Sequence, residues 1–199
     1  MIYLALVGAL LLPAPAVPPA ADTPPAEQVG IELVAAAGTG CSTAAVSLIA
    51  LPGNTGLRLT FAGYRAVAGG DAAPAAVRLT CLLNVAVDVP DGFSYAIARS
   101  DYRGRLHAEP GATVVARSTF YFSGGAAILM QTSTFPGPRT EDWQTTDVVE
   151  PVARPFTPCG QPRILHLYKE LRANAGSAPA APSEISVSDG ALEFAWRRC

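Results

Sequence analysis

The 199-residue sequence predicts an all-β fold, a jelly-roll-like antiparallel β-sandwich of about ten short strands with two disulfides. Three observations support this prediction. Side chains alternate between apolar and polar along several runs, turn-forming residues separate these runs, and the four cysteines form an even set. No stretch combines a helical apolar period with capping residues. We favour a sandwich over a barrel because each alternating strand needs only one buried face.

The clearest strand signal is the run of residues 77–89, VRLTCLLNVAVDV. Its odd-numbered positions are all apolar, whereas Arg78, Thr80 and Asn84 lie on the opposite face. This period of two is typical of a half-buried strand. The pattern places Cys81 on the core side, where a buried disulfide would lie.

Turn-forming residues punctuate the rest of the chain. The segments PGNTG at 52–56, PDG at 90–92 and DG at 189–190 each separate two β-rich runs. The further strands are expected at residues 46–50, 57–61, 93–97, 113–122, 128–134, 145–152, 164–172, 185–187 and 192–196.

The N-terminal region predicts export. Residues 1–21 carry no charged side chain, and the apolar run at 2–12 is shorter than the roughly 20 residues that span a bilayer. Small residues follow this run, so we interpret residues 1–21 as a signal peptide, although no basic residue precedes the run. Residues 22–30 are then a proline-rich linker, and residues 31–199 form a single β-sandwich domain. The protein is expected to be secreted, without a transmembrane span.

The four cysteines, Cys41, Cys81, Cys159 and Cys199, are far apart in the sequence and form no C-x-x-C motif for zinc or redox chemistry. In an exported chain an even set indicates two disulfides, for which three pairings exist. We favour Cys41–Cys81 with Cys159–Cys199, because each bond then closes a sequence-local half of the fold.

Composition excludes some function classes. The formal net charge is −2 and only 15% of residues are charged, so a cationic face for nucleic acid is not expected. The sequence contains no N-x-S/T acceptor for glycosylation. We predict no cofactor and no bound metal.

Catalytic candidates are few. His107 and His166 are the only histidines, and neither has a G-x-S-x-G motif beside it, so we interpret both as surface residues. A glycosidase needs two facing carboxylates, for which Asp88 with Asp91 is one candidate pair. Asp91 is explained more simply as a turn residue.

A second acidic segment offers another candidate pair, Glu141 with Asp142. The same two residues, together with Asp147, could supply oxygen ligands to calcium. No defined calcium-loop pattern is present, and a solvated loop is the simpler interpretation.

Aromatic side chains suggest a binding face. Tyr102, Tyr121, Trp143 and Tyr168 are expected at exposed positions, where a ring can stack on a sugar or anchor a protein. Asp101 and Arg103 flank Tyr102 and add acceptors and donors beside its ring. The predicted binding residues are Asp101, Tyr102, Arg103, Tyr121 and Trp143.

Several segments resemble a secreted bacterial and fungal family, domain of unknown function 4360. They follow the family order along nearly the whole exported part, and Phe156 stands where the family pattern has Trp. The matching segments are Gly38–Ser42, the strand with Cys81, Val89–Phe93, Ser100–Gly104, Ser118–Gly124, Phe135–Pro138, Pro158–Gly160 and Trp196–Cys199. The resemblance implies a secreted, disulfide-bonded β protein and brings no catalytic residues.

We therefore expect a non-enzymatic extracellular binding or cell-surface module with a glycan or protein partner. Two alternatives are a secreted hydrolase with a carboxylate-based site and an extracellular inhibitor protein.

Overall fold

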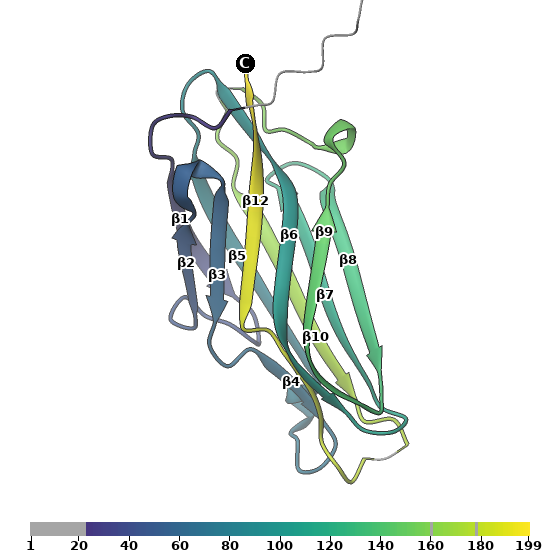
Figure 1. Cartoon of the computed structure of the whole chain (residues 1–199). Helices are drawn as coiled ribbons and strands as arrows, with labels where there is room; N and C mark the ends of the chain where they lie inside the picture. The colour runs from purple at the N-terminus through teal and green to yellow at the C-terminus, as the bar shows by residue number, and fades with distance from the viewer. Residues whose placement is uncertain (1–22, 160, 178) are drawn as a thin grey trace, which may run out of the picture.

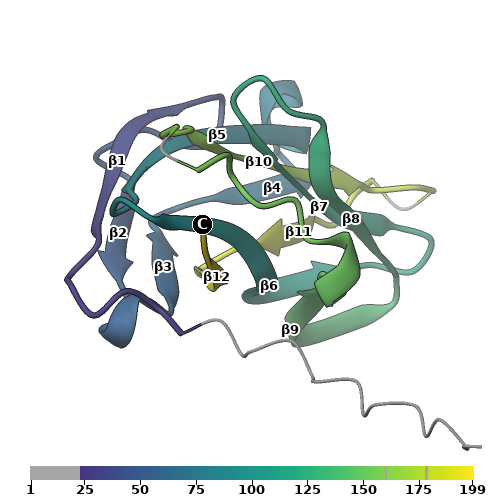
Figure 2. The same cartoon turned by 90° about the horizontal axis from the view of Figure 1, so that it is seen from above.

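The computed structural model describes residues 23–159, 161–177 and 179–199, and within them the chain folds into two antiparallel sheets packed face to face (Figure 1). The view along the sandwich shows the strands of one sheet arching over those of the other (Figure 2). The all-β sandwich prediction is confirmed. The predicted signal peptide at residues 1–21 lies outside the described residues.

The first sheet, called sheet A, has five strands, and its central strands are contributed by distant parts of the chain. In spatial order they are β1 (Gly30–Ala37), β5 (Arg78–Asp88), β10 (Leu165–Asn174), β7 (Thr113–Phe122) and β8 (Ala127–Pro136).

The second sheet, called sheet B, is organised around the long strand β6, which pairs with β9 on one edge and with β12 and then β11 on the other. Strands β3 and β4 pair in turn with β12 and β11, and β2 pairs with β3. Its strands are β2 (Val46–Ala50), β3 (Gly56–Phe61), β4 (Arg65–Ala68), β6 (Phe93–Ala108), β9 (Arg139–Val148), β11 (Ser183–Ser186) and β12 (Asp189–Arg198). Three short 3-10 turns, η1 (Pro52–Asn54), η2 (Pro74–Val77) and η3 (Pro151–Ala153), complete the described elements. Across the described ranges no helix is long and apolar enough to cross a membrane.

The core lies between the sheets and follows the alternation seen in the sequence. In β5 the side chains of Cys81, Leu83, Val85 and Val87 are all buried, whereas Arg78 points outward. Aromatic rings from sheet B, including those of Tyr95 and Trp196, pack against one another in the same layer. Burial of these side chains is the main stabilising contribution to the fold.

Both predicted disulfides are present. Cys41 pairs with Cys81 at a Cα–Cα distance of 5.4 Å, and Cys159 pairs with Cys199 at 6.0 Å. Each bond joins residues 40 positions apart, for which the chain-entropy estimate is about 4 kcal/mol of stabilisation. The favoured pairing is therefore confirmed.

The proline-rich segment before β1 is held against the sandwich. Val29 is buried, and its backbone N–H donates to the Asn54 side-chain oxygen at 3.0 Å. The Asn54 amide nitrogen donates to the carbonyls of Pro25 and Glu27 at 2.9 and 2.6 Å. The part of the predicted linker that the structure describes is thus attached to the domain, and β1 begins at Gly30, inside the predicted linker range.

A β-bulge in β6 reverses which side chains face the core. Phe194 of β12 pairs with Ile97, but the preceding Glu193 pairs with Arg99, so Ala98 is an extra residue in β6. Before the bulge the odd-numbered Tyr95 and Ile97 face the aromatic core. After it the even-numbered residues of β6 face inward and the odd-numbered residues face solvent.

A lysine side chain lies between the two sheets. Lys169, the only lysine in the chain, is buried in β10, and its Nζ donates to Ser118 Oγ at 2.6 Å. Nζ also lies 2.8 Å from the centroid of the Tyr102 ring. Burial lowers the pKa of Lys169 well below its ordinary value, and nearby Asp147 opposes this shift only partly.

Candidate functional site

A shallow polar trough of about 330 Å³ lies on the outward face of sheet B. It crosses β3, β12, β6 and β9, and the register places Arg58, Ala191, Asp101 and Thr146 in one cross-strand row. The small side chain of Ala191 leaves the hollow between Arg58 and Asp101. The lining residues are Leu51, Arg58, Arg99, Asp101, Tyr102, Arg103, Gln144, Asp189, Gly190, Ala191 and Glu193.

The trough continues into a second hollow of about 460 Å³, because Arg103, Gln144 and Asp189 line both. This second hollow lies where β11 ends and β12 begins, and Ser186 and Ser188 lie on its wall. Both volumes are within the range typical of small-molecule sites.

Charges in the trough are held in pairs. The Arg99 guanidinium donates two hydrogen bonds to the Asp101 carboxylate, at 2.7 and 2.9 Å, and Thr146 donates a third. Arg103 donates to Asp189 at 3.0 Å. These arginine contacts lower the pKa values of Asp101 and Asp189 despite partial burial, so both carboxylates are ionised at neutral pH.

Arg58 differs from the other arginines of the trough. Within the described part of the chain its side chain has no hydrogen bond and no ion pair, although its charge contributes to the lowered pKa of Asp189. Its exposed guanidinium therefore offers unused donors at one end of the trough.

The structure brings together two of the predicted binding residues. Asp101 and Arg103 follow the bulge in β6 and both point into the trough.

The predicted exposure of Tyr102 and Trp143 is wrong. Tyr102 is only 1% exposed, because the bulge turns it inward, where its ring lies beneath Gly190 and stacks on Phe120 at 6.3 Å. Trp143 is 3% exposed, since residues 139–148 form strand β9 rather than a loop. It reaches across Gly104 and donates from Nε1 to the Ser186 carbonyl at 3.1 Å. Both rings support the trough from below.

The predicted residue Tyr121 lies on the opposite face of the sandwich. It points outward from β7 in sheet A, is half-buried, and stacks on His166 with ring centroids 4.6 Å apart. Tyr168, which the sequence also suggested as exposed, is half-buried on this same face. Tyr121 therefore belongs to a different surface from Asp101 and Arg103.

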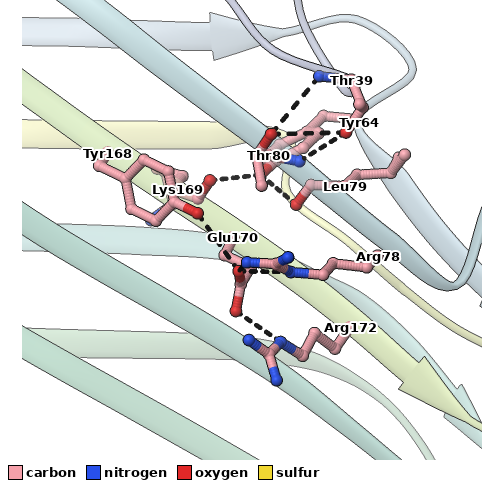
Figure 3. Close-up of polar contacts among 9 residues, drawn as sticks. All are labelled: Thr39, Tyr64, Arg78, Leu79, Thr80, Tyr168, Lys169, Glu170 and Arg172. Atoms are coloured by element: carbon pink, nitrogen blue, oxygen red, sulfur yellow. Dashed lines mark hydrogen bonds and ion pairs between the residues drawn. The ribbon is translucent and has the colours of Figure 1, made fainter.

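The outward face of sheet A carries a closed ionic cluster around Glu170 (Figure 3). Glu170 is 3% exposed and accepts hydrogen bonds from Arg78, from Arg172 at 2.5 Å and from the Tyr168 hydroxyl at 3.2 Å. Burial raises the pKa of the Glu170 carboxyl, but the two arginines outweigh it and hold the pKa below its usual range. Both oxygens of this carboxylate accept hydrogen bonds within the cluster.

The candidate pair Glu141 and Asp142 does not converge. Glu141 and Asp142 are neighbours on β9 and point to opposite faces, and they pair with Arg139 and Arg105, respectively. Over the described residues no group of three metal-ligating side chains is found. Asp88 ends β5, and Asp91 lies in the turn before β6.

The family is decided by a sequence comparison. The family described as domain of unknown function, DUF4360, matches residues 27–199. The chain belongs to DUF4360. This confirms the resemblance seen in the sequence.

A curated relative of this DUF4360 chain is an uncharacterized secreted protein of the fungus Arthroderma benhamiae. It is 29% identical over 154 residues, which cover 77% of this chain and 63% of the relative. The DUF4360 chain thus spans about 63% of the length of that relative. Together with the two disulfides, this relationship identifies a secreted protein.

Solved structures give only distant likenesses to this DUF4360 chain. TmCBM61 in complex with beta-1,4-galactotriose is 12% identical with a TM-score of 0.29, covering 90% of this chain and 92% of that one. The family 11 carbohydrate-binding module of a Clostridium thermocellum cellulase is 9% identical with a TM-score of 0.24, covering 87% and 91%. Scores of this size establish no shared ligand.

Several trough residues of the DUF4360 chain were not predicted. Arg99 could have been found from the sequence, because charged residues occupy the alternate positions 99, 101 and 103 of β6. The remaining residues come from other strands and required the register. They are Arg58, Gln144, Asp189 and Glu193.

Proposed function

We propose that this secreted domain is a binding module and that the trough on sheet B holds an extracellular glycan without hydrolysing it. The observation that carries the proposal is the set of Arg and carboxylate groups that are fixed in pairs along an open groove. Groups held in place before binding lose little side-chain entropy when a ligand arrives.

A glycan suits the trough chemically. Sugar hydroxyls donate and accept, and the trough offers both kinds of group. Arg58 and Arg103 can donate, whereas Asp189 retains acceptor lone pairs beyond the hydrogen bond that it accepts from Arg103. The small floor at Gly190 and Ala191 lets a ring approach the backbone.

Binding is favoured over hydrolysis because neither Asp101 nor Asp189 has the raised pKa that a general acid requires. Glycoside hydrolysis requires one carboxyl group with a raised pKa that stays protonated until it protonates the leaving group. Asp101 and Asp189 both have lowered pKa values through their arginine partners. The proposal therefore assigns recognition, and not bond cleavage, to this face.

A glycan array probed with the full exported chain tests the proposal, followed by isothermal titration of the best hit. Arg103→Ala should weaken binding about tenfold or more, since a hydrogen bond to a charged group is worth roughly 1.5–3 kcal/mol. Gln144→Ala should weaken it by up to about tenfold, since a hydrogen bond between neutral groups is worth roughly 0.5–1.5 kcal/mol.

Arg65→Ala is the matched control. Arg65 pairs with Glu184 at 2.7 Å with 55% of its side chain exposed, close to the 58% of Arg103, but it lies outside the trough. It should bind as the parent does. A parent that binds no glycan on the array, or a control that loses binding as Arg103→Ala does, would contradict the proposal.

A further inference from the structure

Three side chains form a cross-strand row on the outward face of sheet A. The register places His166 of β10 directly between Tyr121 of β7 and Asn84 of β5. Ser123 follows Tyr121 by two residues, and its backbone N–H continues the ladder by donating to the Ile164 carbonyl at 2.9 Å. Ser123 therefore points to the same face as Tyr121 and reaches His166 diagonally.

The His166 imidazole forms hydrogen bonds to both Asn84 and Ser123. His166 Nδ1 lies 2.8 Å from Asn84 Oδ1, and His166 Nε2 lies 3.0 Å from Ser123 Oγ. Because Oδ1 can only accept, Nδ1 carries the proton, which leaves the Nε2 lone pair to accept from the Ser123 hydroxyl. The nucleophile, base and orienting group thus stand in the order that serine and cysteine hydrolases use.

We propose that Ser123, His166 and Asn84 form an acyl-transfer site that hydrolyses short-chain carboxylic esters. Ser123 Oγ bonds to the ester carbonyl carbon while its proton passes to His166 Nε2. The carbon–oxygen bond to the alcohol then breaks, and the alcohol leaves with that proton. Water attacks the acyl-serine in the same way, which releases the acid and restores the hydroxyl. Asn84 is a positioning residue that fixes the tautomer of His166.

Donors for the developing oxyanion lie beside the serine. Among the described residues the Gly124 N–H has no hydrogen-bond partner, whereas the Gly125 N–H is used by the Phe122 carbonyl. The Arg163 guanidinium donates to the Ser123 carbonyl at 3.1 Å, so a positive charge adjoins the nucleophile. A backbone N–H next to the nucleophile and a fixed cation are the groups that stabilise a tetrahedral intermediate.

The surroundings favour a short acyl chain. The row lies on the outward face of a sheet, so the ester approaches from solvent and its acyl group rests on the sheet surface. The Tyr121 ring stacks on His166 and shields one face of the base from water. Ser123, His166 and Asn84 are each half-buried, so none of the three residues is enclosed in the core.

The test uses two probes on the full exported chain, a fluorophosphonate and p-nitrophenyl acetate. The fluorophosphonate should label Ser123, as located by peptide mass spectrometry, and the acetate should be hydrolysed with a burst of nitrophenol. Ser123→Ala should abolish the label, and His166→Gln should lower the rate about 100-fold or more, the range for loss of a general base.

Asn84 separates a positioning role from a structural one. Asn84→Ala should lower kcat while leaving KM nearly unchanged, and Asn84→Asp should restore the rate, because a carboxylate also accepts from Nδ1–H. Circular dichroism and the melting temperature check that each variant is folded.

Two controls account for background reactivity. His107 bonds to Thr140 and Glu109 but to no serine, so His107→Gln should keep the rate. Ser47 is exposed on β2 of sheet B, so Ser47→Ala should keep the label. A parent that is not labelled, a label at another serine, or full activity in folded Ser123→Ala would overturn the proposal.

Discussion

The two outward faces of the sandwich use the same residue types in opposite ways. On sheet A, Arg78 and Arg172 converge on Glu170, whose side chain is 3% exposed and accepts hydrogen bonds on both carboxylate oxygens. On sheet B, Arg103 and Asp189 pair at the surface of an open trough, with 58% and 25% of their side chains exposed. The first arrangement is closed on itself, whereas the second retains donors and acceptors for a ligand.

The difference shows that burial, more than the presence of an ion pair, separates a structural cluster from a binding surface. A buried carboxylate loses its hydration and must be compensated by the protein, so its partners are committed. An exposed pair contributes little to stability and can exchange its water for sugar hydroxyls. Four variants, given from the largest expected effect on stability to the smallest, test this comparison.

Glu170→Gln should lower the free energy of unfolding by about 2–3 kcal/mol, because it places an amide against two guanidinium donors in a buried position. Urea denaturation at pH 7 measures the loss. The pKa of Glu170 is lowered in the folded protein, so the contribution is present above the unfolded-state pKa and is lost as the pH falls through the folded-state value. The difference in free energy of unfolding between parent and variant should therefore disappear at acidic pH. A difference that stays constant with pH would contradict the inference that the ionised form of Glu170 stabilises the fold.

Lys169→Met should raise the free energy of unfolding by about 1–2 kcal/mol at neutral pH, since it replaces a buried amine with an apolar chain of similar length. The pKa of Lys169 is lowered in the folded protein, so the unfolded chain binds the extra proton and the parent gains stability as the pH rises toward the unfolded-state value. The difference in free energy of unfolding between variant and parent should therefore decrease at alkaline pH. Urea denaturation of both proteins across a pH series measures this difference. A variant that is less stable than the parent at every pH would contradict the prediction.

Gly190→Ala should cost about 1–2 kcal/mol and weaken ligand binding without changing any charge in the trough. A Cβ at this position would lie 2.4 Å from Tyr102 Cε1, inside the packed layer beneath the trough. Thermal unfolding and titration of the same sample measure both effects. An unchanged melting temperature would contradict the prediction, because it would mean that the Tyr102 ring can shift away from the added methyl group without cost.

Arg103→Ala should change the free energy of unfolding by less than about 0.5 kcal/mol, the usual range for an exposed ion pair. The same variant should lose ligand binding, as proposed above. If its stability loss equalled that of Glu170→Gln, the contrast between the two faces would not hold.

The sequence was sufficient to predict much of the framework. Alternation through residues 77–89 predicted β5 and the inward position of Cys81, and locality predicted both disulfides. Asp101 and Arg103 were predicted to lie beside an exposed Tyr102 ring, which is wrong. Neighbours at i and i+2 share one face of a strand, so these two residues point into the trough while Tyr102 points to the core.

The trough as a whole could not be predicted, because it depends on register. Arg58 and Asp101 share a row only because β3, β12 and β6 pair with one particular offset. The Ser123–His166–Asn84 site is non-local in the same way, since Asn84 and His166 are 82 positions apart in the sequence. Single-sequence patterns carry little information on such offsets.

The misplaced Tyr102 has a specific cause. Alternation from Tyr95 and Ile97 would assign odd positions to the core throughout β6, and the extra residue Ala98 breaks that continuity.

Deleting Ala98 would therefore alter the fold far more than deleting one residue from a surface loop. Removing this one residue would restore uniform alternation and exchange the two sides of the remaining strand, so that Arg99, Asp101 and Arg103 would be directed into the apolar interior and Tyr102 into water. An insertion or deletion is usually tolerated where the chain is irregular. In β6 a single deleted codon would remove the polar trough of sheet B and the core beneath it together.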